Sequence, residues 1–382
     1  MTISGSAPHD IEQLLRQAAQ LFNDKRSGDA EALLDRAMAQ APDNPEILKS
    51  LAQHYARLGR DRAAISALEK VRKLAPGDFD AEAMLRYLYT SAVKAWHFPM
   101  MNDHARNEAF DRAIRAAVGP DTHVLEIGTG SGLLALMAAR AGARHVTTCE
   151  AVDLIAETAG EIIAANGYGD RVTVVAKPSW ELEVGRDMPD KGDVLISEIL
   201  GTGILDENVV EAFGHARANL LKPGAPVIPR GIGIMSRLVG GPALVDSFSV
   251  GKVQGFDLSP FNRFIPNTAV LREETSNFES FSTDMEVFRI ALDGAPPEPE
   301  TRHLEIAVTR SGISVGVLQW VRLYLDDEIV CENAPAEQLK PSAWKHVLFT
   351  FARPVEVLAG ETLAVVAAHN LQSTIFTLDT SA

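Results

Sequence analysis

Three closely spaced glycines, Gly128, Gly130 and Gly132, limit the folds open to this chain more than any other feature. A short apolar strand, His123–Ile127, runs into these glycines, and an apolar helical stretch follows them. Glycine lets a backbone approach a ligand closely, and the N-terminus of the following helix offers free N–H groups. The segment therefore predicts the strand, ligand-binding loop and helix of a Rossmann-like α/β domain.

The kind of ligand follows from the glycine spacing and from the next strand. Position 133 is Leu, so the chain reads G-x-G-x-G where a dinucleotide-binding unit, the obvious competitor, reads G-x-G-x-x-G. His145–Cys149 predicts a second strand that ends at Glu150, whose carboxylate can accept hydrogen bonds from both hydroxyls of a ribose. These features favour an adenosine-type cofactor without a pyrophosphate, and S-adenosylmethionine (SAM) fits.

Two glutamates flank a glycine-containing loop further along the chain. Glu198 and Glu207 enclose this loop, which follows the apolar run Asp193–Ile196, a predicted buried parallel strand. Ligands bind at the carboxyl ends of such strands. Two carboxylates in one pocket repel each other unless a cation lies between them or one is protonated, and a guanidinium suits that gap. The alternative is that both are ordinary solvated loop acids.

The first 94 residues form a different module, in which similar residues recur at a spacing of 34. The period is that of tetratricopeptide repeats, and the apolar spacing predicts helices at residues 9–23, 27–40, 45–57, 61–74 and 79–93. Two repeats fall short of the three usually needed, so the fifth helix is expected to cap them. A peptide partner for the repeats and a purely structural or dimer-forming role are both open. The recurring pairs are Ala18 and Ala52, Ala30 and Ala64, Leu34 and Leu68, and Pro42 and Pro76.

From about Pro226 the pattern changes to β-strands separated by Gly, Pro and Asp turns. The predicted fold class is therefore multidomain. It combines tetratricopeptide-like helical repeats at residues 1–94, a SAM-binding Rossmann-like domain at 95–225 and a β-barrel-like domain at 226–382. The strands of the last domain are predicted at residues 227–239, 303–309, 316–325, 347–351, 362–369 and 373–378.

Composition excludes several classes of protein. No apolar run approaches the roughly 20 residues of a membrane span, and the first residues lack a signal peptide's basic start and apolar core. Cys149 and Cys331 fall in different predicted domains and no Cys/His cluster has metal-ligand spacing, so we expect a cytoplasmic protein without disulfides or metal. The formal net charge of −15 argues against nucleic acid and suits a basic, arginine-rich partner.

Several segments together resemble the protein arginine N-methyltransferase family, from about Trp96 to the C-terminus. Residues 96–107, Trp-His-Phe-Pro-Met-Met-Asn-Asp-His-Ala-Arg-Asn, resemble the helix with which the family covers its cofactor. The glycine loop with Glu150 resembles its SAM site, and Glu198 and Glu207 resemble its double-glutamate loop. Residues 254–259 and 285–290 resemble its C-terminal β-domain. The sequences of residues 96–100 and of the glutamate loop resemble more closely those of the family branches that make monomethyl or symmetric dimethyl arginine.

The resemblance implies a role for each further residue of the site. Arg106 would pair with the carboxylate of the cofactor's methionine moiety, Met100 would lie near the guanidinium and the transferable methyl group, and His97 would close over the adenosine. Glu126 would bind the glycine loop or the cofactor's amino group, and Ser179 would contact the adenine. A surface position for Arg106, and simple packing for Met100 and His97, are the alternatives.

The chain departs from the family in one loop of the β-domain. The family usually has Thr-His-Trp there, and its His helps to position one of the two glutamates. Residues 342–346 of this chain read Ser-Ala-Trp-Lys-His, so Ala343 stands where the His belongs. Trp344 and His346 are therefore the candidates for positioning the substrate. A buried aromatic of the β-domain is an equally open interpretation of Trp344.

The function that the resemblance implies is methyl transfer from SAM to the guanidinium of an arginine in a protein substrate. It would proceed without a covalent enzyme intermediate, with Glu198 and Glu207 as a clamp for the guanidinium. The alternatives are a non-catalytic SAM-binding scaffold and a SAM-dependent methyltransferase of a small molecule. The family dimerises through an arm, and Pro260–Pro266 resembles a short version of it, so a homodimer is expected.

Overall fold

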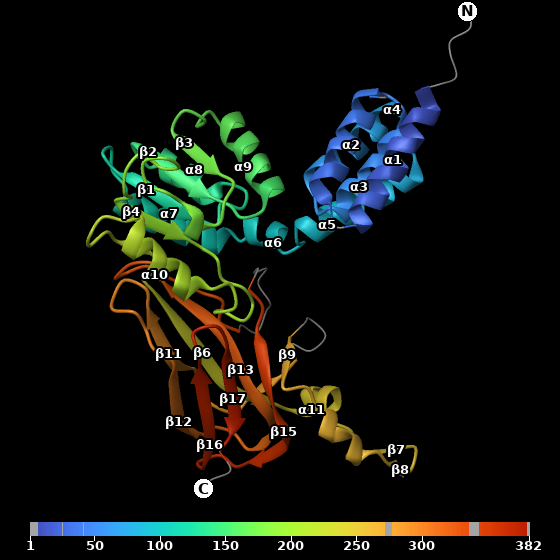
Figure 1. Ribbon diagram of the computed structural model, residues 1–382. Helices are drawn as coiled ribbons and strands as arrows, with labels where there is room; N and C mark the ends of the chain where they lie inside the picture. The colour runs from blue at the N-terminus through green and yellow to red at the C-terminus, as the bar shows by residue number, and fades with distance from the viewer. Residues whose placement is uncertain (1–6, 25, 41, 272–276, 336–343, 380–382) are drawn as a thin grey trace, which may run out of the picture. The chain divides into compact units, whose positions relative to one another are not determined.

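The structure, a computed structural model, describes residues 7–24, 26–40, 42–271, 277–335 and 344–379. The chain forms two compact units, Met1–Ala95 and Trp96–Ala382, which we call unit 1 and unit 2 (Figure 1). Among the helices in the described ranges, none is long and apolar enough to cross a membrane.

Unit 1 is a helical array whose elements begin and end within two residues of their predicted bounds. The apolar residues that recur at a spacing of 34 explain this agreement, because all six alanines and leucines of the recurring pairs are at most 1% exposed. They form the contacts between helices, so the repeat predicted from the sequence is confirmed. The helices are α1 (Ala7–Asn23), α2 (Ser27–Gln40), α3 (Pro45–Arg57), α4 (Asp61–Leu74) and α5 (Phe79–Ala92).

The same spacing sets where two of these helices begin. The side chain of Asn44 accepts hydrogen bonds from the backbone of Glu46 and Ile47 at the start of α3. Asp78, 34 residues later, accepts one from Ala81 at the start of α5. Short polar side chains satisfy the free N–H groups of a helix N-terminus, so the repeat carries its own start signal.

A tyrosine–acid hydrogen bond also recurs at this spacing, although the sequence analysis did not single it out. The hydroxyl of Tyr55 on α3 donates to Asp35 on α2 at 2.8 Å. The hydroxyl of Tyr89 on α5 donates to Glu69 on α4 at 2.6 Å. The interface between α2 and α3 is therefore repeated between α4 and α5, and α5 takes the place of the first helix of a third repeat.

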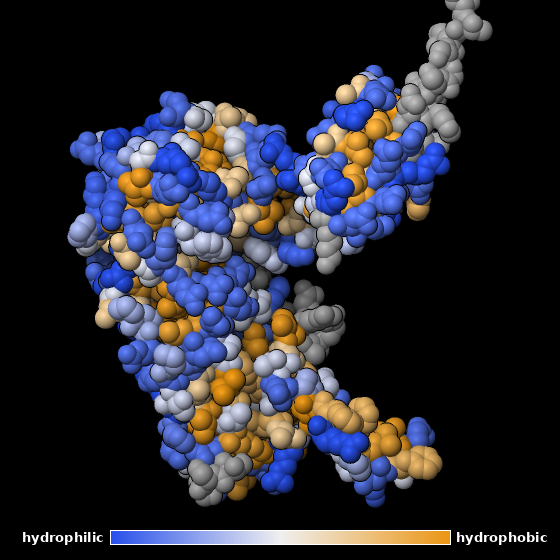
Figure 2. Space-filling view, viewed as in Figure 1, coloured by the Kyte–Doolittle hydropathy of each residue, from blue (hydrophilic) through white to orange (hydrophobic). Residues whose placement is uncertain are grey.

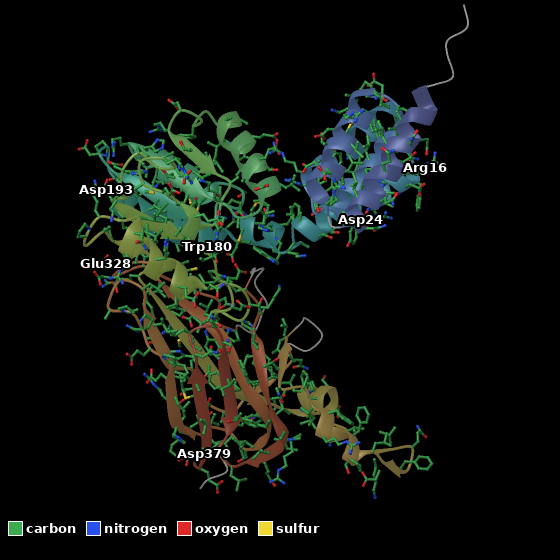
Figure 3. The ribbon with its side chains drawn as sticks, in the orientation of Figure 1. Arg16, Asp24, Trp180, Asp193, Glu328 and Asp379 are labelled. Carbon is green, nitrogen blue, oxygen red and sulfur yellow. The ribbon has the colours of Figure 1, made fainter. Side chains whose placement is uncertain are left out.

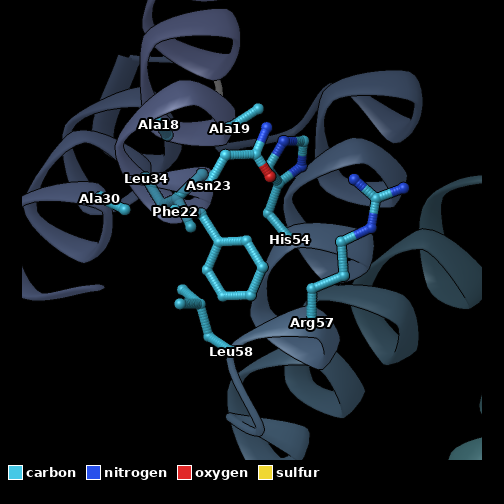
Figure 4. A pocket seen from close by; sticks show the side chains of 9 residues that line it. All are labelled: Ala18, Ala19, Phe22, Asn23, Ala30, Leu34, His54, Arg57 and Leu58. Carbon is cyan, nitrogen blue, oxygen red and sulfur yellow. The ribbon is translucent and has the colours of Figure 1, made fainter. Parts of the chain in front are cut away.

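A pocket opens among α1, α2 and α3 (Figure 4). Phe22, Leu34 and Leu58 supply much of its apolar wall, and His54 and Arg57 supply polar groups. The Nδ1 of His54 donates to the carbonyl of Ser50 at 2.7 Å, which leaves Nε2 free to accept a hydrogen bond in the neutral ring. A peptide partner for the repeats stays a prediction, and this pocket is the feature of unit 1 that fits it.

A five-stranded parallel sheet forms the first half of unit 2, in the order β3-β2-β1-β4-β5. Its last strand, β5, lies just beyond residue 225, the predicted end of the SAM-binding domain. The central strand β1 is buried along its whole length and apolar at most positions, as expected for a sheet covered on both faces. The strands are β1 (His123–Ile127), β2 (His145–Cys149), β3 (Val172–Val175), β4 (Val194–Ser197) and β5 (Val227–Ile228), and the helices are α6 (His97–Met101), α7 (His104–Ala117), α8 (Leu133–Arg140), α9 (Asp153–Ala165) and α10 (Val209–Asn219).

Antiparallel sheets form the second half of unit 2. The predicted strand 227–239 is in fact two strands, β5 of the parallel sheet and β6 of an antiparallel sheet, because Pro229 between them lacks an N–H to donate. One hydrophobic core continues from the parallel sheet into these sheets. The strands are β6 (Gly231–Gly240), β9 (Thr268–Val270), β10 (Glu279–Ser280), β11 (Met285–Ala291), β12 (Glu300–Ala307), β13 (Gly312–Tyr324), β14 (Val330–Glu332), β15 (Val347–Val357), β16 (Thr362–His369) and β17 (Thr374–Leu378).

Residues 242–264, which we call the arm, begin with a helix that packs on the antiparallel sheet through the buried Leu244 and then extend away from the sheets (Figure 1). The arm contains α11 (Pro242–Phe248), the hairpin of β7 (Lys252–Val253) and β8 (Phe256–Asp257), and the 3-10 helix η2 (Ser259–Phe264). Three of its phenylalanines, Phe256, Phe261 and Phe264, are each at least 60% exposed. Figure 2 shows the resulting hydrophobic surface at the end of the arm.

Replacing Tyr55 or Tyr89 by Phe tests the recurring tyrosine–acid bond. Each change should lower the free energy of opening of the adjoining helices by about 1 kcal/mol, because a buried hydrogen bond is lost. Native-state hydrogen exchange of the full chain measures this free energy. Tyr87→Phe is the matched control, since Tyr87 lies on α5 with 69% of its surface exposed. An equal effect of all three substitutions would contradict the assignment.

Candidate functional site

The pairing of β1 with β4 brings the two loops predicted from the sequence together. Ile127 at the end of β1 lies opposite Ser197 at the end of β4, and the Ser197 hydroxyl donates to the Ile127 carbonyl at 2.8 Å. Gly128 follows at a φ of +85°, and a Cβ there would lie 2.5 Å from Cγ2 of Ile199. Glycine is therefore needed at this position, because the glutamate loop packs directly against it.

A pocket lies at this edge of the sheet, next to α6 and the first turn of α7. Six of its lining residues are ones that the sequence singled out: Met100, Arg106, Glu126, Gly128, Gly130 and Glu198. The sequence analysis did not assign the others, which are Met101, Thr129, Ser131, Leu133 and Leu134.

Arg106 is the buried cation of the pocket. Asp103 accepts a hydrogen bond from the Arg106 backbone N–H at 3.1 Å and so starts α7. The side chain of Arg106 is 4% exposed and forms an ion pair with Glu198, which is 3% exposed. Its Nη1 donates to the Asn107 side chain at 2.9 Å, whereas its Nε has no hydrogen-bond partner among the described residues. An arginine held in this way can accept a second anion at the Nε side.

Glu126 is the buried acid of the pocket. Its Oε2 accepts a hydrogen bond from the Thr148 hydroxyl at 2.5 Å, and its Oε1 is buried without a partner among the described residues. Burial raises the pKa of Glu126 to about 8, although hydrogen bonding by Thr148 and by the Ala135 backbone acts in the opposite direction; the charge of Glu150 also raises the pKa and that of Arg106 lowers it. Near neutral pH the group is therefore largely protonated, and an approaching cation would favour the carboxylate.

The glycine loop holds Glu150 at the end of β2. The carboxylate of Glu150 accepts hydrogen bonds from the backbone N–H groups of Gly130 at 3.1 Å and Val152 at 3.0 Å. Gly132 follows at a φ of +80° and leads into α8. The acid is thus fixed beside the loop, with oxygen lone pairs left for further hydrogen bonds.

The glutamate loop is shaped by Asp206. Its carboxylate accepts a hydrogen bond from the backbone of Gly203 at 3.2 Å and occupies the space that a side chain at Gly201 would need. Glu207 follows at once. Glu207 is an exposed residue, but partial burial of its carboxyl raises the pKa of Glu207, and the charges of Asp206, Glu198 and Glu150 raise it further. These charges act on Glu207 because the acids lie close together, which makes this part of the site attractive to a cation.

His97 and Ser179, like Gly132, Glu150 and Glu207, are predicted site residues that do not line the pocket. His97 stacks on Trp96 with ring centroids 3.9 Å apart, and burial lowers its pKa while the charges of Glu150 and Glu198 act against that effect. Ser179 is buried at the start of the 3-10 helix η1 (Ser179–Glu181), next to the exposed Trp180 labelled in Figure 3.

The contacts of Trp344 and His346 keep both residues in the β-domain. The side chain of Asn333 donates to the Trp344 carbonyl at 3.1 Å, and Nε2 of His346 donates to the Asn333 carbonyl at 2.7 Å. Trp344 is part of the hydrophobic core, and burial lowers the pKa of His346. None of these contacts reaches the pocket, and Ala343 lies outside the described residues.

Sequence reasoning missed two partners of the site residues. Thr148 binds Glu126, and it lies directly opposite Glu126 in the parallel pairing of β1 with β2. Aligning the two predicted strands would have found it. Asn107 binds Arg106, and only its place next to Arg106 in the chain gave a signal.

Two family models match parts of the chain. Residues 21–86 match a tetratricopeptide repeat model, and residues 108–237 match the model of the ribosomal protein L11 methyltransferase. The first match falls in unit 1 and the second in unit 2.

Curated relatives match most of the chain. The arginine N(omega)-methyltransferase of Streptomyces achromogenes subsp. streptozoticus is 34% identical over 320 residues, which cover 84% of this chain and 87% of that protein. Protein arginine N-methyltransferase 7 of Drosophila melanogaster is 28% identical over 321 residues, which cover 72% of this chain but 46% of that protein. The chain thus matches about half the length of the insect protein.

A solved structure has a similar fold. The Trypanosoma brucei PRMT1 enzyme–prozyme heterotetrameric complex with AdoHcy contains a chain that superposes with a TM-score of 0.61. The superposition covers 73% of this chain and 88% of that chain at 21% sequence identity. At this identity the likeness shows a shared fold.

Replacing Glu126 by Gln should change how stability depends on pH. Because the folded pKa is raised from 4.5 to about 8, folding takes up a proton between these values. The stabilisation is complete below about pH 4.5 and is lost as the pH rises towards about 8, where a carboxylate must be buried. Glu126→Gln lacks this loss, so its thermal unfolding midpoint should rise relative to that of the wild type over this range. A difference that stays constant with pH would contradict the assignment.

Proposed function

The chain belongs to the arginine N-methyltransferases, and from this premise we propose that it transfers a methyl group from SAM to an arginine of a protein substrate, with Glu198 and Glu207 binding the guanidinium. The observation that carries the proposal is that Glu198 already binds a guanidinium, that of Arg106, in the pocket beside the glycine loop. The other oxygen of Glu198, Oε1, accepts a hydrogen bond from the Leu200 backbone N–H at 3.3 Å, and a carboxylate has further lone pairs with which it can bind a second guanidinium.

The buried groups of the pocket fit SAM. Among the residues that the structure describes, Nε of Arg106 and Oε1 of Glu126 have no hydrogen-bond partner; the first matches the carboxylate of the methionine moiety of SAM, and the second matches its ammonium group. Glu150, fixed beside the glycine loop, can accept hydrogen bonds from the ribose. When bound there, the cofactor supplies an electrophilic methyl group on a sulfonium.

The two glutamates can compensate for the poor nucleophilicity of an arginine side chain. A guanidinium has delocalised lone pairs and a pKa above about 12. Glu198 and Glu207 can localise its positive charge on two nitrogens and orient the third towards the methyl group. Binding of the guanidinium would thereby also align the reacting nitrogen with the methyl group. As the new N–C bond forms, that nitrogen loses a proton. Glu207, whose pKa is raised by burial and by the neighbouring acids, is suited to accept it.

The distribution of charge supports a cationic substrate. Residues 1–95 contain 13 acidic and 13 basic side chains, so unit 1 is formally neutral and the net charge of −15 belongs to unit 2. A negative unit raises the local concentration of cationic ligands and speeds their association. The excess of acids thus lies in the unit that contains the pocket.

Free arginine is a second candidate acceptor. The relative with 34% identity is named as an arginine N(omega)-methyltransferase, without reference to a protein substrate, and its match covers 84% of the chain. The same two glutamates would bind either acceptor. The two candidates differ only in whether the guanidinium belongs to a polypeptide, so one assay can compare them.

Replacing either glutamate of the loop by Gln should stop turnover. Glu198→Gln or Glu207→Gln removes negative charge that acts on the reacting guanidinium and should reduce kcat by about 10²–10³-fold. Binding of S-adenosylhomocysteine should persist. Mass spectrometry of Gly/Arg-rich peptides and of free L-arginine, each incubated with SAM, measures transfer and distinguishes the product types.

Glu211→Gln is the matched control for these variants. Glu211 is an exposed acid on α10, shortly after the glutamate loop, and its replacement should leave turnover unchanged. Wild-type turnover in both glutamate-loop variants would show that the loop does not bind the guanidinium.

We also propose that the chain forms a homodimer through its arm. Phe256, Phe261 and Phe264 are all highly exposed, the rings of Phe261 and Phe264 contact each other, and Figure 2 shows hydrophobic surface at the end of the arm. Exposed apolar patches of this kind mark interaction sites, and one patch shared by two copies gives a symmetric pair. The family resemblance of Pro260–Pro266 points to the same segment.

Polar substitutions in the arm should dissociate the dimer. The double variant Phe256→Ser, Phe261→Ser removes most of the apolar contact, so sedimentation at micromolar concentration should show a monomer where the wild type shows a dimer. Phe79→Ser is the matched control, because Phe79 is also a highly exposed phenylalanine but lies on α5 of unit 1. A wild-type protein that sediments as a monomer would count against the proposal.

A further inference from the structure

The three nitrogens of the Arg106 guanidinium have different surroundings. Nη2 binds Glu198, Nη1 donates to Asn107, and Nε is buried without a partner among the described residues. Nε and Nη2 point along the same edge of a guanidinium, the edge that can hold a carboxylate with two parallel hydrogen bonds. The contact with Asn107 occupies the opposite nitrogen, so the Nε–H, together with the second N–H of Nη2, is the donor pair that can bind a further carboxylate.

Asn107 makes two hydrogen bonds, and they need different atoms of its carboxamide. Its Oδ1 accepts from Arg106 Nη1 at 2.9 Å, and its Nδ2 donates to the carbonyl of Met101 at 2.8 Å. Met101 is the last residue of α6, the short helix that also carries Met100 and His97. Asn107 therefore links the buried arginine to the end of the helix beside the pocket.

We propose that Asn107 is a positioning residue, which orients the Arg106 guanidinium so that its Nε–Nη2 edge faces the carboxylate of the cofactor. The inference rests on the proposed function, in which Arg106 binds that carboxylate. A long arginine side chain has several rotatable bonds, and fixing it in advance reduces the entropy lost when the ligand binds. The bond to Met101 fixes the carboxamide itself.

Few side chains can replace this carboxamide. Ala removes both bonds. Asp keeps an acceptor for Nη1, but it cannot donate to the Met101 carbonyl, and it adds a second negative charge, besides Glu198, to the guanidinium that must bind the cofactor carboxylate. The prediction for Asn107 is therefore a specific loss of affinity for ligands that carry the carboxylate.

Two adenosine ligands separate positioning from a general structural role. S-adenosylhomocysteine carries the amino-acid carboxylate, whereas 5′-methylthioadenosine lacks it. In calorimetric titrations of the full chain, Asn107→Ala should weaken the first ligand by ~10-fold, as expected for one lost charge-assisted hydrogen bond. It should leave the second ligand within about twofold. Asn107→Asp should show the same pattern, and it serves as the test if Asn107→Ala does not fold.

Asn102→Ala is the matched control. The side chain of Asn102 also donates to a carbonyl of α6, that of Phe98 at 2.9 Å, but it makes no hydrogen bond with Arg106. A further control is the Arg106→Ala background, in which Asn107→Ala should have no additional effect, because residues that act through one another are not additive.

Each outcome of these titrations has one meaning. Equal loss of both ligands in Asn107→Ala, an equal loss in Asn102→Ala, or a full additional loss in the Arg106→Ala background would overturn the inference. A wild-type chain that binds neither ligand would instead refute the proposed function. Unchanged affinity for S-adenosylhomocysteine in Arg106→Ala would refute the role of Arg106 and the role of Asn107 with it.

Discussion

The in-register pairing of β1 with β4 is the constraint on which the site depends. Parallel neighbours end at the same edge of a sheet, so the glycine loop and the glutamate loop, which are far apart in the sequence, come into direct contact. Gly128 allows this contact by having no side chain. The contact in turn sets Glu198 beside Arg106, so a backbone register determines which charges meet in the pocket.

Much of the fold followed from local sequence patterns, because each depends on residues close in the chain. The apolar spacing within each segment predicted the five helices described in unit 1, the spacing of 34 predicted their repetition, and the glycines predicted the loop between β1 and α8. Strand predictions were poorer where a proline divided one apolar run between two sheets, or where a strand was as short as β14. The match to arginine methyltransferases confirms the family that the motifs indicated.

The inner arrangement of the site could not be predicted in the same way. Arg106 and Glu198 are 92 residues apart, and nothing local in the sequence indicates that one binds the other. The contact of Thr148 with Glu126 depends on the register of two strands. Trp344 and His346 were singled out by resemblance to a family loop; each makes a hydrogen-bonded contact with Asn333, and their role in positioning a substrate stays a prediction. Long-range pairing, rather than residue type, decides these cases.

The tyrosine–acid bond that recurs in unit 1 makes its helical array modular. Tyr55 reaches back to Asp35, and Tyr89 reaches back to Glu69, across the same separation of 20 residues. The pair of α3 and α4 therefore carries a donor, Tyr55, to the pair that precedes it and an acceptor, Glu69, for the helix that follows it. An additional segment of 34 residues with the same tyrosine and acid would form this hydrogen bond with the repeat before it and with the repeat after it. The array can therefore lengthen or shorten by whole repeats without a change in its interfaces.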